Sequence, residues 1–297
     1  MSTQQDVLAY GPVHLEVTDV PRSAAFYQEV LGLVPVPRDG TGTALGTGEV
    51  PLVVLHRGAR YPKRPGHSGL YHLALHVSTA GDFAGAITRI ARHAWPQAPT
   101  DHITHWATYL DDPDGIQVEV AFETIERVVR YEAGPGWPVI IDRDGRSRHA
   151  VEPLDMEHVM GHAREGAHYS PMADGTVVGH LHLHVRALDE GQAFLCDVVG
   201  MRPNVAAPAI GFADLSLGGG FPHRMAINTW QRPGTPHPEG TAGMRHAELL
   251  WHDEDLHDAA LARLERAGAL DGESEGQPRA VDPSGTAFAV AVAGTAA

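Results

Sequence analysis

The sequence predicts an α+β fold built from four copies of one β-α-β-β-β unit. In each copy, a strand with alternating polar and apolar residues is followed by an amphipathic helix and then by further strands. The chain is long enough for two ordinary domains, each with its own core. We place the four units at residues 8–58, 70–123, 178–231 and 244–294.

The ends of the predicted elements follow from particular residues. Pro21 suits the start of a helix and Gly32 suits its end, so a helix is expected over residues 21–33. The corresponding helices are expected at residues 82–94, 189–199 and 255–267. The opening strands of the units are expected at residues 13–18, 71–77, 179–185 and 245–250, and the closing strands of the second and fourth units follow turns at residues 112–115 and 282–285.

The second and third units are separated by a connector, residues 124–177, that is long for a loop in a compact domain. A weak helical pattern over residues 151–163 predicts one helix within it. Turns are expected at residues 134–138 and 142–145, which are rich in Gly, Pro and Asp. We therefore expect a connector that wraps around the units and contains one helix.

Composition excludes several classes of partner. The formal charge of -15 and the lack of a basic stripe argue against nucleic acid and anionic membranes. No apolar stretch approaches the length of a membrane span, and the first ten residues do not resemble a signal peptide, so a cytoplasmic protein is expected. The single cysteine, Cys196, excludes an intramolecular disulfide, whereas 20 histidines invite a search for metal ligands.

Four segments carry a resemblance to a known superfamily. They are residues 26–33 (FYQEVLGL), 109–115 (YLDDPDG) with Glu119, 179–185 (GHLHLHV) and 223–230 (HRMAINTW). The chain resembles the vicinal oxygen chelate superfamily, which includes glyoxalases, extradiol dioxygenases and bleomycin-resistance proteins. The last two segments, together with Asp101 and His102, are particularly similar to catechol 2,3-dioxygenase-like proteins. The resemblance implies barrel-like, cupped mixed sheets with helices outside.

In this superfamily two units face each other to form a cup, and their first strands each supply a histidine while one last strand supplies a glutamate. Aligning the first strands places Pro12, His72 and His180 at one position, with His246 as the equivalent in the fourth unit. Only the second and third units together then offer a complete set, namely His72, Glu119 and His180. We expect these units to form the metal cup and the first and fourth units to form a metal-free cup, with the roles of His14 and His246 left open.

Two imidazoles and one carboxylate are typical of the facial triad that binds non-haem Fe(II), and Mn(II) is an alternative. The resemblance therefore implies an extradiol dioxygenase that cleaves a small aromatic diol with O₂. It also implies site roles: Tyr109 hydrogen-bonds a reacting oxygen, His223 acts as acid or base and His102 relays protons. Substrate contacts or pocket lining are expected from His182, His184, Asn228 and Trp230.

Two other functions remain open on the sequence. A glyoxalase-like isomerase or lyase normally adds a fourth carboxylate ligand, and residues 215–231 contain no Asp or Glu. A metal-free binding protein of the antibiotic-resistance type would not need the triad. The ring substituents of the substrate and the oligomeric state stay open, although a homo-oligomer that uses the outer cup as a scaffold or subunit contact fits this arrangement.

Overall fold

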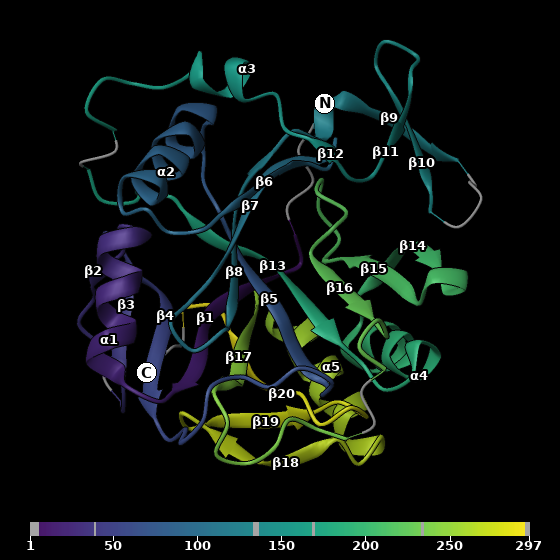
Figure 1. The fold of residues 1–297 in the computed structure, drawn as a ribbon. Helices are drawn as coiled ribbons and strands as arrows, with labels where there is room; N and C mark the ends of the chain where they lie inside the picture. The colour runs from purple at the N-terminus through teal and green to yellow at the C-terminus, as the bar shows by residue number, and fades with distance from the viewer. Residues whose placement is uncertain (1–5, 39, 133–136, 168–169, 233–234, 295–297) are drawn as a thin grey trace.

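Two large mixed β-sheets organise the fold, and helices pack against them (Figure 1). The computed structural model describes residues 6–38, 40–132, 137–167, 170–232 and 235–294. The predicted α+β class is confirmed, and within the described residues neither sheet closes into a barrel. Apolar residues from both sheets and from the helices form one continuous buried cluster.

The inner sheet contains nine strands contributed by the second and third units and by the connector. Its centre is the antiparallel pair β5 and β13, which are the first strands of these two units. Across the sheet the strands are β12 (Glu152–Pro153), β6 (Ala98–Asp101), β7 (His105–Asp111), β8 (Gln117–Glu123), β5 (Gly69–His76), β13 (Val177–His184), β16 (Met225–Asn228), β15 (Phe212–Ser216) and β14 (Arg202–Ala207).

The outer sheet contains eight strands from the first and fourth units, and its centre is the antiparallel pair β1 and β17. Figure 1 shows the yellow C-terminal strands lying beside the purple N-terminal one. Across the sheet the strands are β18 (Leu270–Ser274), β19 (Gln277–Val281), β20 (Ala287–Val292), β17 (Gly243–Trp251), β1 (Leu8–Val17), β4 (Val50–Arg57), β3 (Thr43–Thr47) and β2 (Val34–Pro35).

The register at the centre of the inner sheet positions the side chains of interest. Strand β13 runs antiparallel to β5 with His180 opposite Ala74 and His182 opposite His72. Strand β8 runs parallel to β5 with Glu119 beside Ala74. Because side chains alternate between the faces of a sheet, these pairings bring His72, His180 and Glu119 to the same face at the junction of the two units.

The helices lie close to their predicted positions. In the first and third units an α-helix continues into a π-helical segment, and a glycine with positive φ follows each segment, Gly32 at 79° and Gly200 at 102°. A left-handed residue of this kind ends a helix without strain only when it is glycine. The helices are α1 (Val20–Ala25) with the π-segment Phe26–Val30, α2 (Ala80–Arg92), α4 (Leu188–Ala193) with the π-segment Phe194–Val199, and α5 (Glu254–Arg266).

The connector corrects the sequence-based expectation. It forms a three-stranded sheet of β9 (Val128–Glu132), β10 (Val139–Asp142) and β11 (Ser147–His149). The sequence predicted one helix in the connector and no strands. Its helix, α3 (Met156–Met160), is shorter than predicted because Pro153 pairs in strand β12 and Asp155 caps the helix. The turn at residues 142–145 is confirmed by a hydrogen bond from the Gly145 amide to Asp142, whereas most of the turn expected at 134–138 lies outside the described residues.

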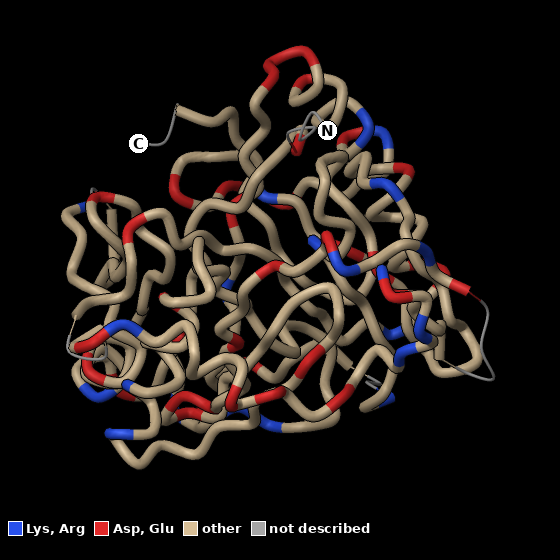
Figure 2. The backbone as a smooth tube through the Cα atoms, turned by 90° about the horizontal axis from the view of Figure 1, so that it is seen from above, with Lys and Arg blue, Asp and Glu red and all other residues tan. Residues whose placement is uncertain are grey.

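Charge is distributed over the molecule without an obvious organising surface. Figure 2 shows acidic and basic residues interspersed along the chain. Among the helices of the described residues, none is long and apolar enough to cross a membrane.

Candidate active site

Three ligand-type side chains converge at the junction of the second and third units. The Nε2 atoms of His72 and His180 lie 3.2 Å apart, and each lies 3.1 Å from Oε2 of Glu119. All three side chains are buried. Adjacent ligands about 2.1 Å from an octahedral ion lie about 3.0 Å apart, so this nearly equilateral triangle matches one face of an octahedral site.

The protonation states of these groups also suit a metal. Burial lowers the pKa of His72 and of His180, so both imidazoles are neutral at neutral pH. Burial alone would raise the pKa of Glu119, but His180, His105 and His72 bring it well below its usual range. Neither Glu119 oxygen has a partner with hydrogen-bond geometry. A buried carboxylate among neutral imidazoles lacks a compensating charge, which a divalent cation would supply.

A chain of hydrogen bonds fixes the orientation of His180. Nδ1 of His180 lies 2.8 Å from Nε2 of His76, and Nδ1 of His76 lies 2.9 Å from the Glu123 carboxylate. Because a carboxylate only accepts, His76 donates to Glu123 and accepts the Nδ1 hydrogen of His180. This tautomer leaves the Nε2 lone pair of His180 directed at the triangle. Arg224 donates to the other end of the chain, 2.6 Å from Glu123.

Replacing His76 with phenylalanine is expected to weaken metal binding about 10- to 100-fold, because His180 would lose the acceptor that fixes its tautomer. Competition with a chelator at equilibrium measures this affinity. The matched control is His56→Phe in the outer cup, where His56 makes an equivalent imidazole contact, 2.8 Å to His14. Equal affinity in the wild type and the His76 variant would contradict the role assigned to the relay.

His105 is a site residue that the sequence reasoning missed. Its Nε2 lies 3.1 Å from Oε1 of Glu119, the oxygen that faces away from the triangle. Its Nδ1 lies 2.8 Å from the Thr104 hydroxyl, and donation by that hydroxyl leaves the Nε2 hydrogen facing Glu119. The sequence contained a signal for His105. It lies four residues before Tyr109 on one strand, and because side chains alternate between the faces of a strand, the two share one face of β7.

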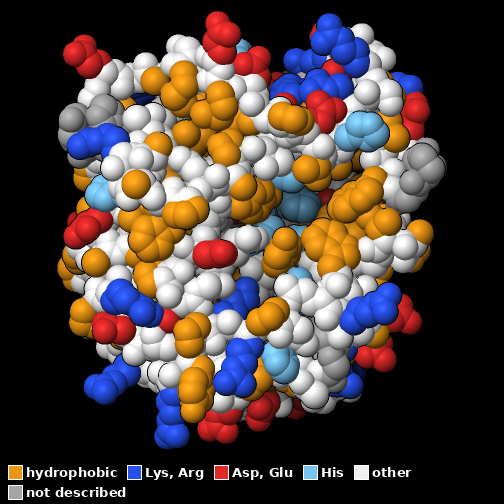
Figure 3. Space-filling model, in the orientation of Figure 1, with side chains coloured by type: hydrophobic (Ala, Val, Ile, Leu, Met, Phe, Trp, Pro, Cys, Tyr) orange, Lys and Arg blue, Asp and Glu red, His pale blue; other side chains and the backbone are white. Residues whose placement is uncertain are grey.

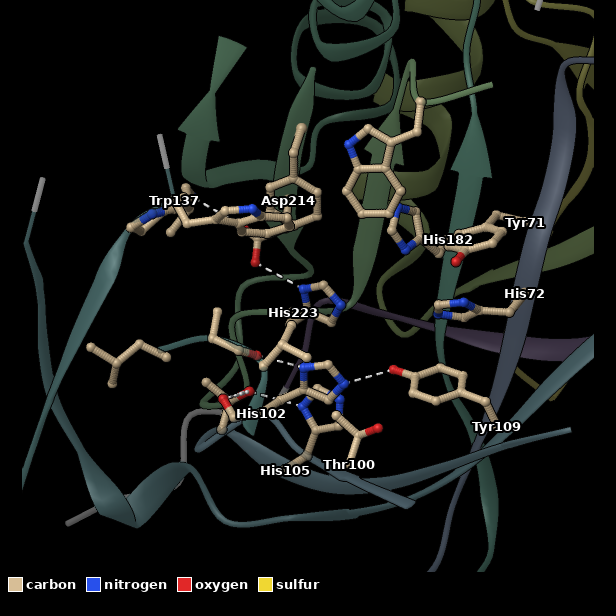
Figure 4. Close-up of a pocket in the computed structure, with 18 of the residues that line it drawn as sticks. Tyr71, His72, Thr100, His102, His105, Tyr109, Trp137, His182, Asp214 and His223 are labelled. Atoms are coloured by element: carbon tan, nitrogen blue, oxygen red, sulfur yellow. Dashed lines mark hydrogen bonds and ion pairs between the residues drawn. The ribbon is translucent and has the colours of Figure 1, made fainter. Parts of the chain in front are cut away.

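A cavity of about 510 Å³ opens beside the triangle. Figure 3 shows it as a hollow with histidine on its floor and hydrophobic side chains around its rim. Figure 4 shows His72, Tyr71 and His182 on one side and Trp137 at the opposite end. Of the predicted catalytic and substrate-binding residues, the lining includes Tyr109, His223, His102, His182 and Trp230.

Tyr109 and His102 form a hydrogen-bonded pair on one wall of this cavity (Figure 4). Nδ1 of His102 donates to the carbonyl oxygen of Ala150 at 2.7 Å, so Nε2 accepts from the Tyr109 hydroxyl at 2.8 Å. Burial lowers the pKa of His102 to about 3, and burial followed by Glu119 raises the pKa of Tyr109 well above its ordinary value. The tyrosine is therefore a neutral phenol whose oxygen can accept a hydrogen bond from a ligand.

His223 and Asp214 form a second pair on another wall (Figure 4). Nδ1 of His223 lies 2.9 Å from Oδ2 of Asp214, which directs Nε2 away from the carboxylate. Asn204 donates to both oxygens of Asp214 at 3.0 and 3.1 Å and holds this carboxylate in place. A carboxylate that orients an imidazole is an arrangement used for general acid–base chemistry. The sequence reasoning identified His223 but not Asp214.

Two predicted substrate contacts are placed elsewhere by the structure. Asn228 lies behind the cavity wall, where its amide contacts His182 Nε2 and His184 Nδ1 at 2.7 Å each. His184 lines a separate, smaller pocket beside Lys63. The parallel pairing of β13 with β16 directs Asn228 toward the histidines of β13, and neither residue is in the lining of the larger cavity, so direct substrate contact by them stays a prediction. Their observed contacts instead orient His182.

The outer cup contains a histidine cluster of its own, including His14, His56 and Glu275, whose ligand atoms lie within 4.8 Å of one another. Here His14 is paired on both sides of its ring. Nδ1 of His14 lies 2.8 Å from His56 and its Nε2 lies 3.1 Å from Glu248, which also accepts from Arg38 at 2.6 Å. A guanidinium group at this position opposes the binding of a cation.

His246, stacked on His14 in the outer cup, should make stability depend on pH. Burial, followed by His14, lowers its pKa to about 2, and neither ring nitrogen has a hydrogen-bond partner. Below a pH of about 6.5 the unfolded chain binds a proton that the folded chain does not, so stability falls as pH falls, by at most about 1.4 kcal/mol per pH unit. His246→Leu is expected to reduce the slope of the unfolding free energy against pH by the contribution of about one proton. Urea unfolding of the metal-free protein between about pH 5 and 7 measures this slope. His93→Leu, at an exposed position, should leave the slope unchanged; an unchanged slope in the His246 variant would refute the assignment.

A family model described as the Glyoxalase/Bleomycin resistance protein/Dioxygenase superfamily matches residues 10–120. This match confirms the resemblance to the superfamily that was predicted from the sequence. Its members include dioxygenases and glyoxalases, so superfamily membership by itself leaves the reaction open.

Similarity to individual proteins extends over nearly the whole chain. Catechol-2,3-dioxygenase of Bacillus subtilis strain 168 is 28% identical over 284 residues, which cover 94% of this chain and 95% of that protein. The solved structure of a B. subtilis protein that is provisionally named a dioxygenase has a TM-score of 0.59 at 14% identity. The match covers 98% of this chain and 86% of that protein. Glyoxalase I from Zea mays has a TM-score of 0.56 at 16% identity, covering 97% and 92%. These two structures show the shared fold alone.

Proposed function

We propose that this chain is an extradiol dioxygenase that cleaves a catechol-type aromatic diol with O₂, using a metal held by His72, His180 and Glu119. The observation that carries the proposal is the buried triangle of two imidazole nitrogens and one carboxylate oxygen beside a cavity of ring-binding size. Fe(II) is the ion favoured by a two-histidine, one-carboxylate face, with Mn(II) as the alternative. The similarity to a catechol-2,3-dioxygenase supports the same reaction.

The reaction breaks the ring C–C bond next to the diol and adds both oxygen atoms of O₂, so the ring is oxidised while O₂ is reduced. When bound, the metal would supply a site at which the diol oxygens and O₂ are held side by side. In this proposal Tyr109 accepts a hydrogen bond from a diol hydroxyl while its own hydroxyl donates to His102. The diol proton leaves along this pair only if Tyr109 passes its own proton to Nε2 of His102 in the same step, so that the phenol stays neutral.

His223 is placed to serve the later proton transfers. Its ring is held by Asp214 and lines the same cavity as Tyr109, from the third unit rather than the second. A histidine oriented by a carboxylate donates and accepts protons without changing position. Apolar residues around the rim exclude water from the site, which protects reactive species from hydrolysis.

The ligand set favours ring cleavage over glyoxalase chemistry. In the second unit Glu119 lies beside Ala74 in the parallel pairing of β5 and β8, and in the third unit the equivalent partner of His182 is Ala226. A fourth carboxylate ligand on this strand would have to occupy the position of Ala226. Because alanine offers no ligand atom, the site keeps an open face for substrate.

The outer cup, in our proposal, binds no metal and acts as a scaffold. His14 and Glu248 are engaged with each other and with Arg38, and Pro12 and Ala289 occupy the positions that supply ligands in the inner cup. Metal analysis of the intact protein should therefore give one ion per chain.

Anaerobic reconstitution with Fe(II), followed by a panel of catechols, tests the proposed function. We expect O₂ uptake that is stoichiometric with the diol and the appearance of a yellow ring-opened product. Parallel reconstitution with Mn(II) identifies the preferred ion. Metal binding without O₂ uptake on any catechol would overturn the dioxygenase assignment, and isomerisation of a thiol adduct of an oxoaldehyde would support the glyoxalase alternative instead.

A further inference from the structure

The cavity is larger than a catechol ring requires. A cavity of about 150 Å³ suffices for one benzene ring, whereas this one measures about 510 Å³. Resting on the proposed function, we propose that the cavity also binds an uncharged, aryl-sized substituent of the substrate, in a subsite formed by Trp137, Phe212 and Trp230. We call these three residues the aromatic cluster.

The aromatic cluster extends from His182, whose ring centroid lies 5.4 Å from that of Trp230, to Trp137 at the end of the cavity away from His72. Figure 4 separates Trp137 clearly from His72. The ring centroids of Trp137 lie 5.5 Å from Phe212 and 5.9 Å from Trp230, and those of Phe212 and Trp230 lie 6.0 Å apart. These separations are typical of interacting aromatic rings. The indole nitrogen of Trp230 donates to the Ile210 carbonyl at 2.8 Å, which fixes the orientation of this ring.

The cluster is partly open to water, so a ligand would gain free energy by covering it. Trp137 is 39% exposed and Trp230 is 41% exposed, which is unusual for side chains of this size. Ile140 and Val151 extend the same apolar wall. An apolar group placed here removes its own surface and that of the tryptophans from water.

The charges around the cavity define the class of substituent. No lysine or arginine is among the residues that line it in the described structure, so an anionic substituent such as a carboxylate has no partner. The only acidic side chain in the lining, Asp214, is already engaged with His223 and Asn204. Burying a charged substituent against the cluster would therefore cost free energy, whereas an aryl group needs no polar partner.

Part of this subsite comes from the connector rather than from the repeated units. Trp137, Ile140 and Val151 all lie between the second and third units in sequence, and Trp137 packs directly against Phe212 and Trp230 of the third unit. The proton-transfer residues Tyr109 and His223 belong to the units themselves. The residues that select the substituent therefore lie partly in the connector, whereas the residues that transfer protons lie in the repeated units. The connector is a specificity-determining segment.

The experiment compares kcat/KM of the reconstituted enzyme for catechol, phenylcatechol isomers and a carboxylate-bearing catechol. We expect a preference for a phenylcatechol over catechol and poor turnover of the carboxylate. Trp137→Ala should reduce the phenylcatechol preference about tenfold or more, with little change for catechol, and Trp230→Ala should reduce the phenylcatechol preference at least as much. The matched control is Val129→Ala in strand β9 of the connector. The Val129 side chain is exposed and does not line the cavity.

Binding of 2-hydroxybiphenyl, which lacks the vicinal diol, distinguishes failure of this inference from failure of the proposed function. Calorimetric binding that is weakened in both tryptophan variants would support the subsite even if no catechol were cleaved. An unchanged preference in both variants would overturn the inference, as would a preference for the carboxylate or for a quaternary ammonium substituent. If one variant is poorly folded, circular dichroism identifies it and the other decides the result.

Discussion

Replacing Glu119 with alanine is expected to abolish metal binding and ring cleavage while the chain stays folded. Glu119 supplies the only anionic ligand of the triangle, and His72 and His180 would be left as two neutral imidazoles. Loss of a direct ligand should cost more than the 10- to 100-fold typical of an outer partner, so metal should be lost on dialysis. The measurements are metal content after Fe(II) reconstitution and thermal unfolding followed by circular dichroism.

The matched control for this prediction is Glu248→Ala, which removes a buried carboxylate of the outer cup. That change leaves Arg38 without its partner and should lower stability by about 1–3 kcal/mol, yet the metal should remain bound. Glu119→Gln, which keeps the shape of the side chain, separates the loss of charge from the creation of a cavity. Retained turnover in the Glu119 variants would count against the proposed metal site.

Replacing His223 with glutamine is expected to lower kcat by about 100- to 10,000-fold with the metal still bound. Glutamine can keep a hydrogen bond to Asp214 but cannot exchange a proton near neutral pH. Steady-state O₂ uptake and metal content test both parts of this prediction.

Asp214→Asn provides the companion measurement for His223. It should give a smaller loss of kcat, because His223 stays in the cavity but its orientation and charge stabilisation are weakened. His93→Gln, at an exposed position, is the matched control and should behave as the wild type. A kcat within tenfold of the wild type for His223→Gln would assign the acid–base role to another group, with His102 as the next candidate.

Much of the fold could be predicted from the sequence because its determinants are local and repeated. Strand periodicity, the helix-ending glycines Gly32 and Gly200 and the recurring turns act within each unit and place its elements. The pairing β5–β13 was inferred by asking which two units together carry the ligand pattern that the superfamily resemblance implies. The resemblance supplied the cup and the ligand pattern, and the residue types at equivalent positions selected the units.

The parts that could not be predicted depend on tertiary packing. The connector strands β9, β10 and β11 have no strong period, and their pairing and the cavity above them exist only in the folded chain. The same holds for Asp214 and His76, which act through contacts with residues distant in sequence. The displacement of Asn228 from the cavity follows from a strand register that periodicity alone does not give.

The orientation of His180 is tied to the very start of the described chain. Arg224, which holds Glu123 and through it His76, is itself held by Asp6 at 2.9 Å, just before the first strand of the outer sheet. Tyr10 of that strand also donates to the Arg224 carbonyl at 2.8 Å. The half that carries the proposed metal site is therefore tied to the outer sheet. A fragment comprising residues 70–231 would retain His72, His180 and Glu119 yet lack Asp6, which anchors the side chains that orient His180.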